Sequence, residues 1–297
     1  MNLHPVSIIG AGAMGGAMAQ CLLKAGHDVI VRDVQPAREA ALKALGARTA
    51  ASPAEAGRLA QTLFIVVVDR DEIAAVLDGA PGLPGLLSSL TPQHTVFFNS
   101  TIAPEDVQGF CQQVVSAGAR AVDAPISGGP ARAAAGTMSM MLAAPEAVLA
   151  QHETLLARMT AKRFVISTRY GDGAKAKLAN NLMAGLNLLA GAEALALGER
   201  MGLDPGQLLK LMAVSSGQSW MADDRLPRAL AGDYEPRAQT KVLTKDVRLA
   251  NEMAQSKGLA LPLGERAAQL YAQACKAGFD LEDDAAVLKH YRQLFGV

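Results

Sequence analysis

A glycine-rich stretch near the start of the chain constrains the fold more than any other feature. "GAGAMG" occupies residues 10–15, directly after the apolar run "VSII" and directly before a helix-length segment. In this G-x-G-x-x-G pattern Gly10 permits a tight turn, Gly12 lets a ligand approach the backbone, and Gly15 lets the helix pack on the strand. A Gly-rich turn without a ligand can share the pattern. Its place between strand and helix favours a dinucleotide, whose diphosphate would face the helix N-terminus.

The second strand-like run, "HDVIVRD" at 27–33, ends in Asp33. An acidic side chain here can accept hydrogen bonds from a ribose diol and repels a 2′-phosphate. Val34 follows, where an arginine could have paired with that phosphate, and Arg32 should point to the opposite face of the strand. We therefore predict NAD, with NADP less favoured, bound by Gly10, Ala11, Gly12, Ala13, Met14, Gly15, Asp33, Val67 and Val68.

Two patterns divide the chain. In the first half, short β-branched runs alternate with helix-length segments, as in βαβ units with a mostly parallel sheet; the runs lie at 6–10, 27–33, 62–68, 95–99, 119–125, 137–143 and 163–167. After Gly173, helix-period segments follow one another to Phe295. We predict an α/β fold with a Rossmann domain at 1–168, an all-helical domain at 169–297, and a long helix at about 174–201 joining them.

Composition argues against several classes of partner. With 28 basic and 28 acidic side chains, and no run of Lys or Arg that could follow a phosphate backbone, we expect no nucleic-acid partner. Cys21, Cys111 and Cys275 have neither CxxC nor zinc spacing, which predicts no disulfide and no metal site. The N-terminus lacks a signal-peptide pattern, and the most apolar stretch, 178–197, contains three asparagines and a glutamate. We expect a cytoplasmic protein without a membrane span.

The stretch "GDGAKAKLANN" at 171–181 places two lysines at the head of the long helix. At about 100° per residue, Lys177 shares a face with Asn180 and Asn181, whereas Lys175 groups with apolar residues. Hydride chemistry needs a proton donor or acceptor at the substrate oxygen, and the five histidines fit surface or capping positions better. The helix N-terminus disfavours the ammonium, which makes Lys177 a candidate acid/base. On this stretch alone, an ordinary lysine at a helix end remains the commoner interpretation.

A second unusual stretch is "DAPISGGPARAAAGTM" at 123–138. Ser127, Gly128 and Gly129 follow the carboxyl end of a strand, where open α/β sheets bind ligands, and backbone amides beside a hydroxyl suit a carboxylate. A hydrolase interpretation fails because Pro125 stands where a G-x-S-x-G elbow needs glycine. A Gly-rich surface loop without a ligand remains the alternative.

Taken together, these motifs resemble the β-hydroxyacid dehydrogenases, the family of 3-hydroxyisobutyrate dehydrogenase and tartronate semialdehyde reductase. The family's order and spacing are matched over nearly the whole chain by "IIGAGAMGGAMAQCLLKAGHDVIVRD", "STIAPED", "DAPISGGPARAAAGTMSMM", "GDGAKAKLANN" and "KDVRLA". The resemblance implies a Rossmann domain joined by one long helix to an all-helical 6-phosphogluconate-dehydrogenase-like domain. It also implies an active site in the cleft between them.

The resemblance further implies roles for single residues. The family's catalytic lysine falls on Lys177 and its substrate-binding asparagine on Asn181. The loop that holds the substrate carboxylate falls on Ser127, Gly128 and Gly129. In this mechanism the neutral lysine takes the hydroxyl proton as hydride leaves for NAD, and the ammonium returns it in the reverse reaction.

Three further matches complete the expected site. Thr101 matches a contact near the nicotinamide, and Lys245 matches a lysine that closes over coenzyme and substrate. In the C-terminal half, "SSGQSWMADDR", "AGDYEPRA" and "LEDDAAVLKHY" are most similar to the L-threonate dehydrogenase branch, which implies a substrate contact for Trp220.

The resemblance predicts an NAD-dependent oxidoreductase acting on a small hydroxy acid, with L-threonate oxidised at C2 as the specific expectation. Oxidation of 3-hydroxyisobutyrate and reduction of tartronate semialdehyde (2-hydroxy-3-oxopropionate) remain alternatives. An imine reductase shares the architecture but usually lacks the lysine, and a silent NAD-binding module would give no turnover. The small-residue, apolar second domain indicates a buried subunit interface, so we expect a homodimer or homotetramer that binds a small carboxylate.

Overall fold

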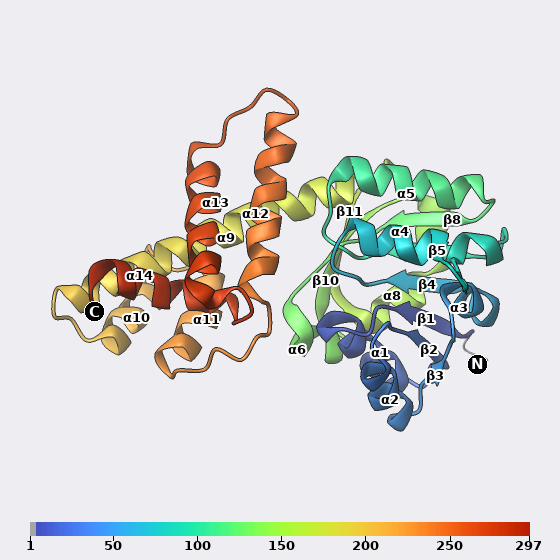
Figure 1. Ribbon diagram of the computed structural model, residues 1–297, viewed down its shortest axis with the longest axis horizontal. Helices are drawn as coiled ribbons and strands as arrows, with labels where there is room; N and C mark the ends of the chain where they lie inside the picture. Colours follow the sequence, from blue (N-terminus) through green and yellow to red (C-terminus); the bar gives the residue numbers. More distant parts are fainter. Residues whose placement is uncertain (1–3) are drawn as a thin grey trace. The chain divides into compact units, whose positions relative to one another are not determined.

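The computed structural model describes residues 4–297, and the chain forms two compact units. Unit 1 runs to Lys177 and unit 2 begins at Leu178, so the division falls inside helix α9 (Asp172–Arg200). That helix is continuous over 29 residues and corresponds to the long helix expected at about 174–201 (Figure 1).

Unit 1 is built on a nine-stranded sheet in the order β11-β10-β8-β7-β4-β1-β2-β3, with β9 paired to β10. Pairing is parallel except where β10 meets β8 and β9, which confirms a mostly parallel α/β sheet. The strands are β1 (Val6–Ile9), β2 (Val29–Arg32), β3 (Arg48–Thr49), β4 (Thr62–Ile65), β7 (Thr95–Phe98), β8 (Arg120–Asp123), β9 (Ile126–Ser127), β10 (Met138–Ala143) and β11 (Thr160–Ser167). A separate short hairpin joins β5 (Gly79–Ala80) to β6 (Leu83–Pro84).

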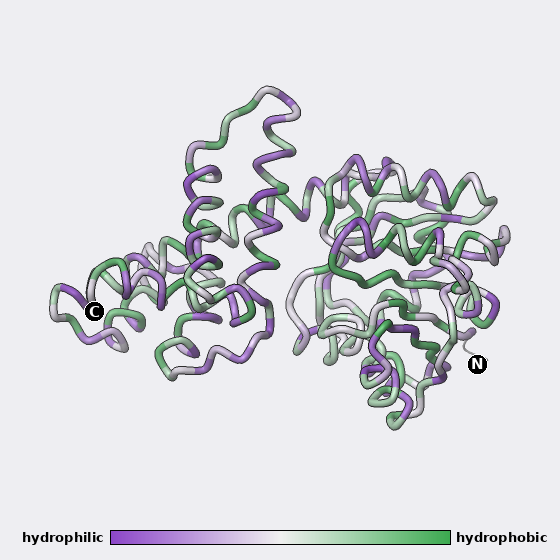
Figure 2. The backbone as a smooth tube through the Cα atoms, in the orientation of Figure 1, coloured by the Kyte–Doolittle hydropathy of each residue, from purple (hydrophilic) through white to green (hydrophobic). Residues whose placement is uncertain are grey.

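Helices cover both faces of this sheet because successive strand residues point to opposite sides. Ile8 belongs to the core beneath α1, α2, α6, α7 and α8, and Ile9 to the core beneath α3, α4 and α5 (Figure 1). Figure 2 shows the apolar colouring concentrated along the strands. The helices are α1 (Ala13–Lys24), α2 (Pro36–Ala44), α3 (Pro53–Leu59), α4 (Arg70–Asp78), α5 (Pro104–Ser116), α6 (Gly129–Ala134), α7 (Glu146–Gln151) and α8 (Glu153–Met159), with a 3₁₀ turn η1 (Leu86–Ser89).

Several helices of unit 1 begin at residues whose chemistry explains the start. Helices α2, α3 and α5 open with Pro36, Pro53 and Pro104, whose fixed φ suits the first helical position. The side chains of Ser52 and Asp69 cap α3 and α4 by accepting the backbone N–H three residues later. These caps fix the ends of helices that flank the sheet.

Unit 2 consists of helices around the remainder of α9. They are α10 (Pro205–Ala213), α11 (Trp220–Leu230), α12 (Thr240–Gln255), α13 (Pro262–Ala274) and α14 (Val287–Phe295), with a π-helical turn η2 (Cys275–Phe279) and a 3₁₀ turn η3 (Asp284–Ala286). The fully buried Tyr271 of α13 donates its hydroxyl to the Gly185 carbonyl oxygen of α9 at 2.9 Å. A Cβ at Gly185 would lie 2.7 Å from Val247 Cγ2 of α12, so glycine lets these helices approach closely.

Helix α9 is apolar for most of its length. Among residues 4–297 it is the one helix that is long and apolar enough to cross a membrane by length and composition. Half of its most apolar 18-residue window is buried inside the protein, and Leu188 and Leu195 are fully buried in the core of unit 2. This burial is typical of a core helix.

Candidate functional site

The three motif glycines have different surroundings at the junction of β1 and α1. Gly10 has φ +95°, and a Cβ there would lie 2.3 Å from the Val66 carbonyl oxygen. A Cβ at Gly15 would lie 1.9 Å from the Gly10 carbonyl oxygen, so both positions exclude a side chain. At Gly12, by contrast, the nearest atom to a Cβ is Arg38 Nη1 at 3.8 Å. The helix N-terminus is thus open at Gly12, as a diphosphate ligand requires.

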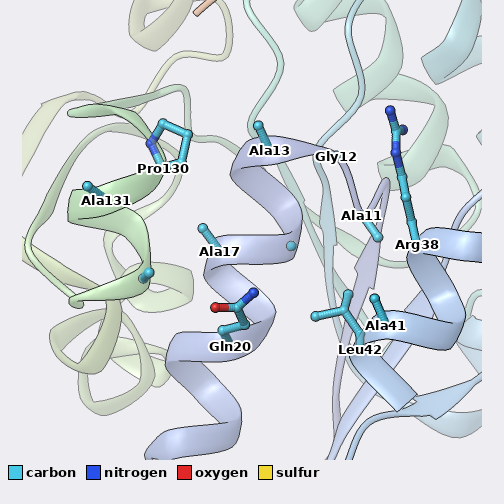
Figure 3. Close-up of a pocket in the computed structure, with 12 residues that line it drawn as sticks. Ala11, Gly12, Ala13, Ala17, Gln20, Arg38, Ala41, Leu42, Pro130 and Ala131 are labelled. Carbon is cyan, nitrogen blue, oxygen red and sulfur yellow. The ribbon is translucent and has the colours of Figure 1, made fainter. Parts of the chain in front are cut away.

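Gly12 lies at one end of a hollow of about 540 Å³ in unit 1. Figure 3 shows α1 between α6 and α2, with Ala13 and Ala17 of α1 facing the hollow beside Pro130 and Ala131 of α6. Small side chains line most of the hollow, so backbone groups at the start of α1 are accessible to a bound molecule. The residues present therefore fit the diphosphate part of a dinucleotide.

Asp33 is buried just beyond the end of β2 and fixes the glycine-rich turn. Its Oδ2 accepts the backbone N–H of Ala11 at 2.6 Å, and its Oδ1 accepts that of Gln35 at 2.8 Å. Arg38 Nη1 lies 3.6 Å from Oδ2. Asp33 is therefore at the expected place for a ribose contact, but a guanidinium offsets part of its charge.

Arg38 was not among the residues predicted for the site. Val34 occupies the position next to Asp33, whereas an arginine from α2, Arg38, extends alongside Gly12 (Figure 3). Arg32 is engaged elsewhere, because its Nη1 donates to Glu39 Oε1 at 3.0 Å. The available signal was the spacing, since Arg38 comes in the first turn of a helix that opens directly after the acidic strand end.

Further coenzyme candidates lie at the carboxyl ends of the neighbouring parallel strands β4 and β7. Val67 and Val68 follow β4, and Thr101 follows β7. Ser100 joins the two loops, because its hydroxyl donates to the Val67 carbonyl oxygen at 2.7 Å. The sheet thus brings these three residues to the edge where doubly wound folds bind ligands.

The loop expected to hold a carboxylate connects β9 to α6. Ser127 ends β9, and Gly128 and Gly129 have φ +121° and +74°, conformations that L side chains rarely adopt. Asn99, after β7, supports the approach to this loop by donating its Nδ2 to the Ala124 carbonyl oxygen at 2.6 Å. The backbone of the loop is therefore held in a shape that glycine makes possible.

The two lysines of α9 have different environments. Lys175 Nζ lies 2.7 Å from Asp172 Oδ1, and the Lys175 side chain is 45% exposed. The hydrogen bond from Lys175, followed by that from Ser167, holds the pKa of Asp172 down at about 2. Lys177 is only 7% exposed, although it lies just two residues further along the same helix. Residues two apart in a helix point to nearly opposite sides, which is consistent with the burial of Lys177 and the exposure of Lys175.

In unit 2, a buried polar cluster gathers around Asp246 of α12. Asn181 Nδ2 donates to Asp246 Oδ2 at 2.6 Å, and Lys245 Nζ lies 3.0 Å from Asp246 Oδ1. Asn180 Nδ2 donates to Asn181 Oδ1 at 3.2 Å. Asn181 and Lys245 were predicted from the sequence, whereas Asp246, which stands next to Lys245 in "KDVRLA" and contacts both side chains, was not.

Comparison with known proteins agrees with this geometry. Residues 5–167 match the family described as the NAD binding domain of 6-phosphogluconate dehydrogenase, and residues 171–291 match that described as NAD-binding of NADP-dependent 3-hydroxyisobutyrate dehydrogenase. An L-threonate dehydrogenase of Cupriavidus necator is 36% identical over 284 residues, which are 96% of this chain and 95% of that one. The chain belongs to the β-hydroxyacid dehydrogenase family.

Two other relatives of this dehydrogenase are similar over almost the same length. The mitochondrial 3-hydroxyisobutyrate dehydrogenase of Mus musculus is 32% identical, with 97% of this chain and 87% of that one covered. The crystal structure of 3-hydroxyisobutyrate dehydrogenase from Salmonella typhimurium has a TM-score of 0.88 at 32% identity, covering 96% of this chain and 99% of that one. The protein is an NAD(P)-dependent oxidoreductase that acts on the CH–OH group of a hydroxy acid, with a Rossmann domain followed by a helical domain.

Trp220, the remaining candidate in this dehydrogenase, opens helix α11 in unit 2 and is 46% exposed. The Arg225 guanidinium lies 5.9 Å from its ring centroid. Arg225 Nε in turn donates to the buried Asp284 at 2.6 Å. The indole is thus a partly exposed aromatic surface above a buried ion pair.

Two histidines of the dehydrogenase, His27 just before β2 and His290 of α14, are buried. The expectation of a solvent-facing position was wrong for His290. Burial lowers the pKa of His27 and His290 and brings that of His152 to about 4. His94 closes its own turn by accepting the Thr91 backbone N–H at 2.9 Å. That Lys177 rather than a histidine transfers the proton stays a prediction.

Proposed function

We propose that this enzyme oxidises L-threonate at C2, with Lys177 as the general acid/base. The observation that carries the proposal is the buried lysine one helical turn before Asn181, whose amide is held by Asp246. The relative with 36% identity over 96% of the chain, named L-threonate dehydrogenase, supports this substrate. Other small hydroxy acids, 3-hydroxyisobutyrate above all, are the alternative supported by the second group of relatives.

In the proposed mechanism, bound NAD would supply the acceptor for the hydride of the substrate carbon. The neutral Lys177 amine takes the hydroxyl proton in oxidation, and the ammonium returns it to the carbonyl oxygen in reduction. Ser127, Gly128 and Gly129 bind the carboxylate, because a hydroxyl and bare backbone amides suit an anion. Asn181 hydrogen-bonds the reacting oxygen.

Three further residues are proposed to contact the coenzyme or the substrate. Thr101 contacts the nicotinamide end, Lys245 closes over coenzyme and substrate, and Trp220 contacts the distal hydroxyls of a four-carbon acid. NAD is the proposed coenzyme in preference to NADP because Asp33 can accept from a ribose diol. The proposed coenzyme-binding set is Gly10, Ala11, Gly12, Ala13, Met14, Gly15, Asp33, Val67, Val68, Thr101 and Lys245.

We propose a coenzyme-binding domain at 1–168 and a helical domain at 169–297, acting in the cytoplasm without a metal or nucleic-acid partner. A homodimer or homotetramer is expected, since Leu197 and Met201 expose apolar side chains one turn apart at the end of α9. Sedimentation at micromolar concentration tests this, and a monomer would contradict it.

A substrate screen tests the proposed function. NADH formation is followed with L-threonate, D-glycerate, 3-hydroxyisobutyrate and tartronate, and NADH consumption with tartronate semialdehyde. We expect the highest kcat/KM for L-threonate. A higher value for another acid would replace the substrate and leave the chemistry in place. Binding of NADH without turnover of any acid would instead indicate a silent module.

A further inference from the structure

A buried carboxylate at the end of β8 has no role in the chemistry described above. Asp123 has no solvent exposure, and its Oδ2 accepts the backbone N–H groups of Gly171 at 2.9 Å and Ala174 at 3.2 Å. Its Oδ1 is also buried and accepts no hydrogen bond from the residues between 4 and 297. A strand-end carboxylate therefore caps the helix that begins about 50 residues later, because it accepts the backbone N–H of Gly171, directly before α9, and that of Ala174 in its first turn.

The helix backbone is fitted closely to this carboxylate. A Cβ at Gly173 would lie 2.9 Å from the Cγ and from both carboxylate oxygens of Asp123. No side chain fits there without displacing Asp123 or the helix. The close approach between α9 and β8 therefore requires glycine at position 173, in addition to any conformational freedom that this glycine provides.

Asp123 also stands at the start of the proposed carboxylate-binding loop. It pairs in register with Phe98 of β7, and Asn99 holds the carbonyl of the next residue, Ala124. Four residues after Asp123 comes Ser127, and three residues after Ala174 comes Lys177. One side chain therefore connects the base of the loop to the helical turn that precedes the lysine.

We propose that Asp123 is a positioning residue for the reaction: its carboxylate fixes the first turn of α9 and thereby sets where the Lys177 amine lies relative to the Ser127–Gly129 loop. The inference rests on the proposed role of Lys177. Both segments belong to unit 1, so the connection lies within one compact body. A displacement of about 1 Å between reacting groups is sufficient to cost roughly 10² in rate.

The surroundings of Asp123 are compatible with a charged carboxylate at the start of α9. Burial raises the pKa of Asp123 to about 6, while the backbone N–H groups of Ala174 and Gly171, followed by that of Gly173, lower it and the nearby Asp172 raises it. The charge of Asp123 also acts on the Cys111 thiol of α5, because burial, followed by that charge, raises the pKa of the thiol. Near neutral pH the carboxylate is mostly ionised, and the helix N-terminus compensates its charge.

The test is a double-mutant cycle between Asp123 and Lys177. Asp123→Asn retains an oxygen acceptor but loses the charge, and we expect it to lower kcat by roughly 10-fold to 10²-fold. The Kd for NADH, measured by fluorescence, should change by less than about 2-fold, because the Gly12 region is untouched. In a Lys177→Ala background, Asp123→Asn should lower kcat no further, because a residue that acts through the lysine has nothing left to position.

Equal losses of kcat in the wild-type and Lys177→Ala backgrounds would overturn the inference, as would a fall in thermal stability with kcat unchanged. Gly173→Ala is the second variant, since its methyl group pushes on the same carboxylate; it should reproduce the loss of kcat. Gly109→Ala in α5 is the matched control and should retain activity, because a Cβ there meets no atom of residues 4–297 within 4 Å apart from its chain neighbours and its own helix backbone. Near wild-type turnover in Lys177→Ala alone would instead remove the proposed function of that lysine.

Discussion

Asn181 donates its side-chain amide to Asp246 across 2.6 Å, although 65 residues separate them in the sequence. Both side chains are buried, and Asp246 also lies 3.0 Å from the Lys245 ammonium. A buried amide that is already held in one orientation loses little entropy when it binds a substrate oxygen. The contact therefore holds the Asn181 amide in one orientation, as its proposed role in binding the substrate requires.

Replacing Asp246 should weaken substrate binding. Asp246→Ala leaves the Asn181 amide without its acceptor, at a cost of about 1–3 kcal/mol, which corresponds to roughly a 5-fold to 150-fold loss in kcat/KM for the hydroxy acid. Steady-state kinetics at saturating coenzyme measures it. Glu252→Gln, on the exposed side of the same helix, is the control and should leave kcat/KM unchanged. An unaltered kcat/KM in Asp246→Ala would show that Asn181 needs no such support.

Lys177 and Lys175 provide a matched pair two residues apart. Lys177→Ala should lower kcat by roughly 10² or more, because proton transfer at the substrate oxygen loses its donor and acceptor. Lys175→Ala removes an exposed partner of Asp172 and should keep near wild-type turnover. Single-turnover rates and the Kd for NADH separate chemistry from coenzyme binding. Equal kcat values for the two variants would contradict the assignment of the base.

Much of the candidate site can be predicted from the sequence, because the patterns that indicate it involve residues close together in the chain. The angle between successive helix residues is enough to place Lys177 and Lys175 on different faces of the helix. A glycine-rich motif that directly follows a strand is enough to locate Gly12. Both signals depend only on neighbours along the chain. Asp123 and Asp246 stood inside motifs that had been recognised, yet their partners lie 48 and 65 residues away. Such pairings depend on which strand end meets which helix, and periodicity carries no information about that.

The lack of long-range information in sequence patterns also explains the other differences between the predictions and the structure. The two-residue strands β3 and β9 are too short to show the alternation of apolar and polar residues that identifies a strand in a sequence. His290 lies in a mixed polar and apolar helix, where burial depends on how the helix packs in unit 2. Arg38 reaches Asp33 from a different element, so looking only at the adjacent position in the sequence could not find it.

We expect the coenzyme preference to depend on the pair Asp33 and Arg38. We expect a higher kcat/KM with NAD than with NADP, because Asp33 repels a 2′-phosphate. Since Arg38 lies 3.6 Å from that carboxylate and offsets its charge, Arg38→Gln should lower kcat/KM with NADP more than with NAD. Arg48→Gln removes an exposed arginine paired with Asp28 and is the control. Comparable efficiency with both coenzymes in the wild type would refute the preference for NAD.

His152 should make the folded enzyme sensitive to acid. Burial, followed by the charge of Arg120, lowers its pKa from 6.5 to about 4. The folded state therefore disfavours the proton that the unfolded chain binds, so this stability is present above pH 6.5 and is lost as the pH falls toward 4. The slope is at most about 1.4 kcal/mol per pH unit. Urea unfolding at several pH values measures it.

His152→Gln should flatten that slope relative to the wild type. Asp123 contributes with the opposite sign over part of the same range, since its pKa is raised to about 6 and its contribution falls as the pH rises. The difference between variant and wild type is therefore the informative quantity. His4→Gln, at an exposed histidine, is the control. Identical slopes for His152→Gln and the wild type would contradict the assignment.

The glycines of the coenzyme turn should separate binding from stability. Gly15→Ala forces a methyl group to within 1.9 Å of the Gly10 carbonyl oxygen, so we expect the free energy of unfolding to fall by about 1–3 kcal/mol or more. At Gly12 the nearest atom to a Cβ is 3.8 Å away, so Gly12→Ala should fold normally. Its methyl group would instead occupy the approach of the diphosphate and raise the Kd for NADH by roughly 10-fold or more. Calorimetry on both variants measures the stability and the NADH affinity. The prediction is wrong if Gly12→Ala binds NADH as tightly as the wild type.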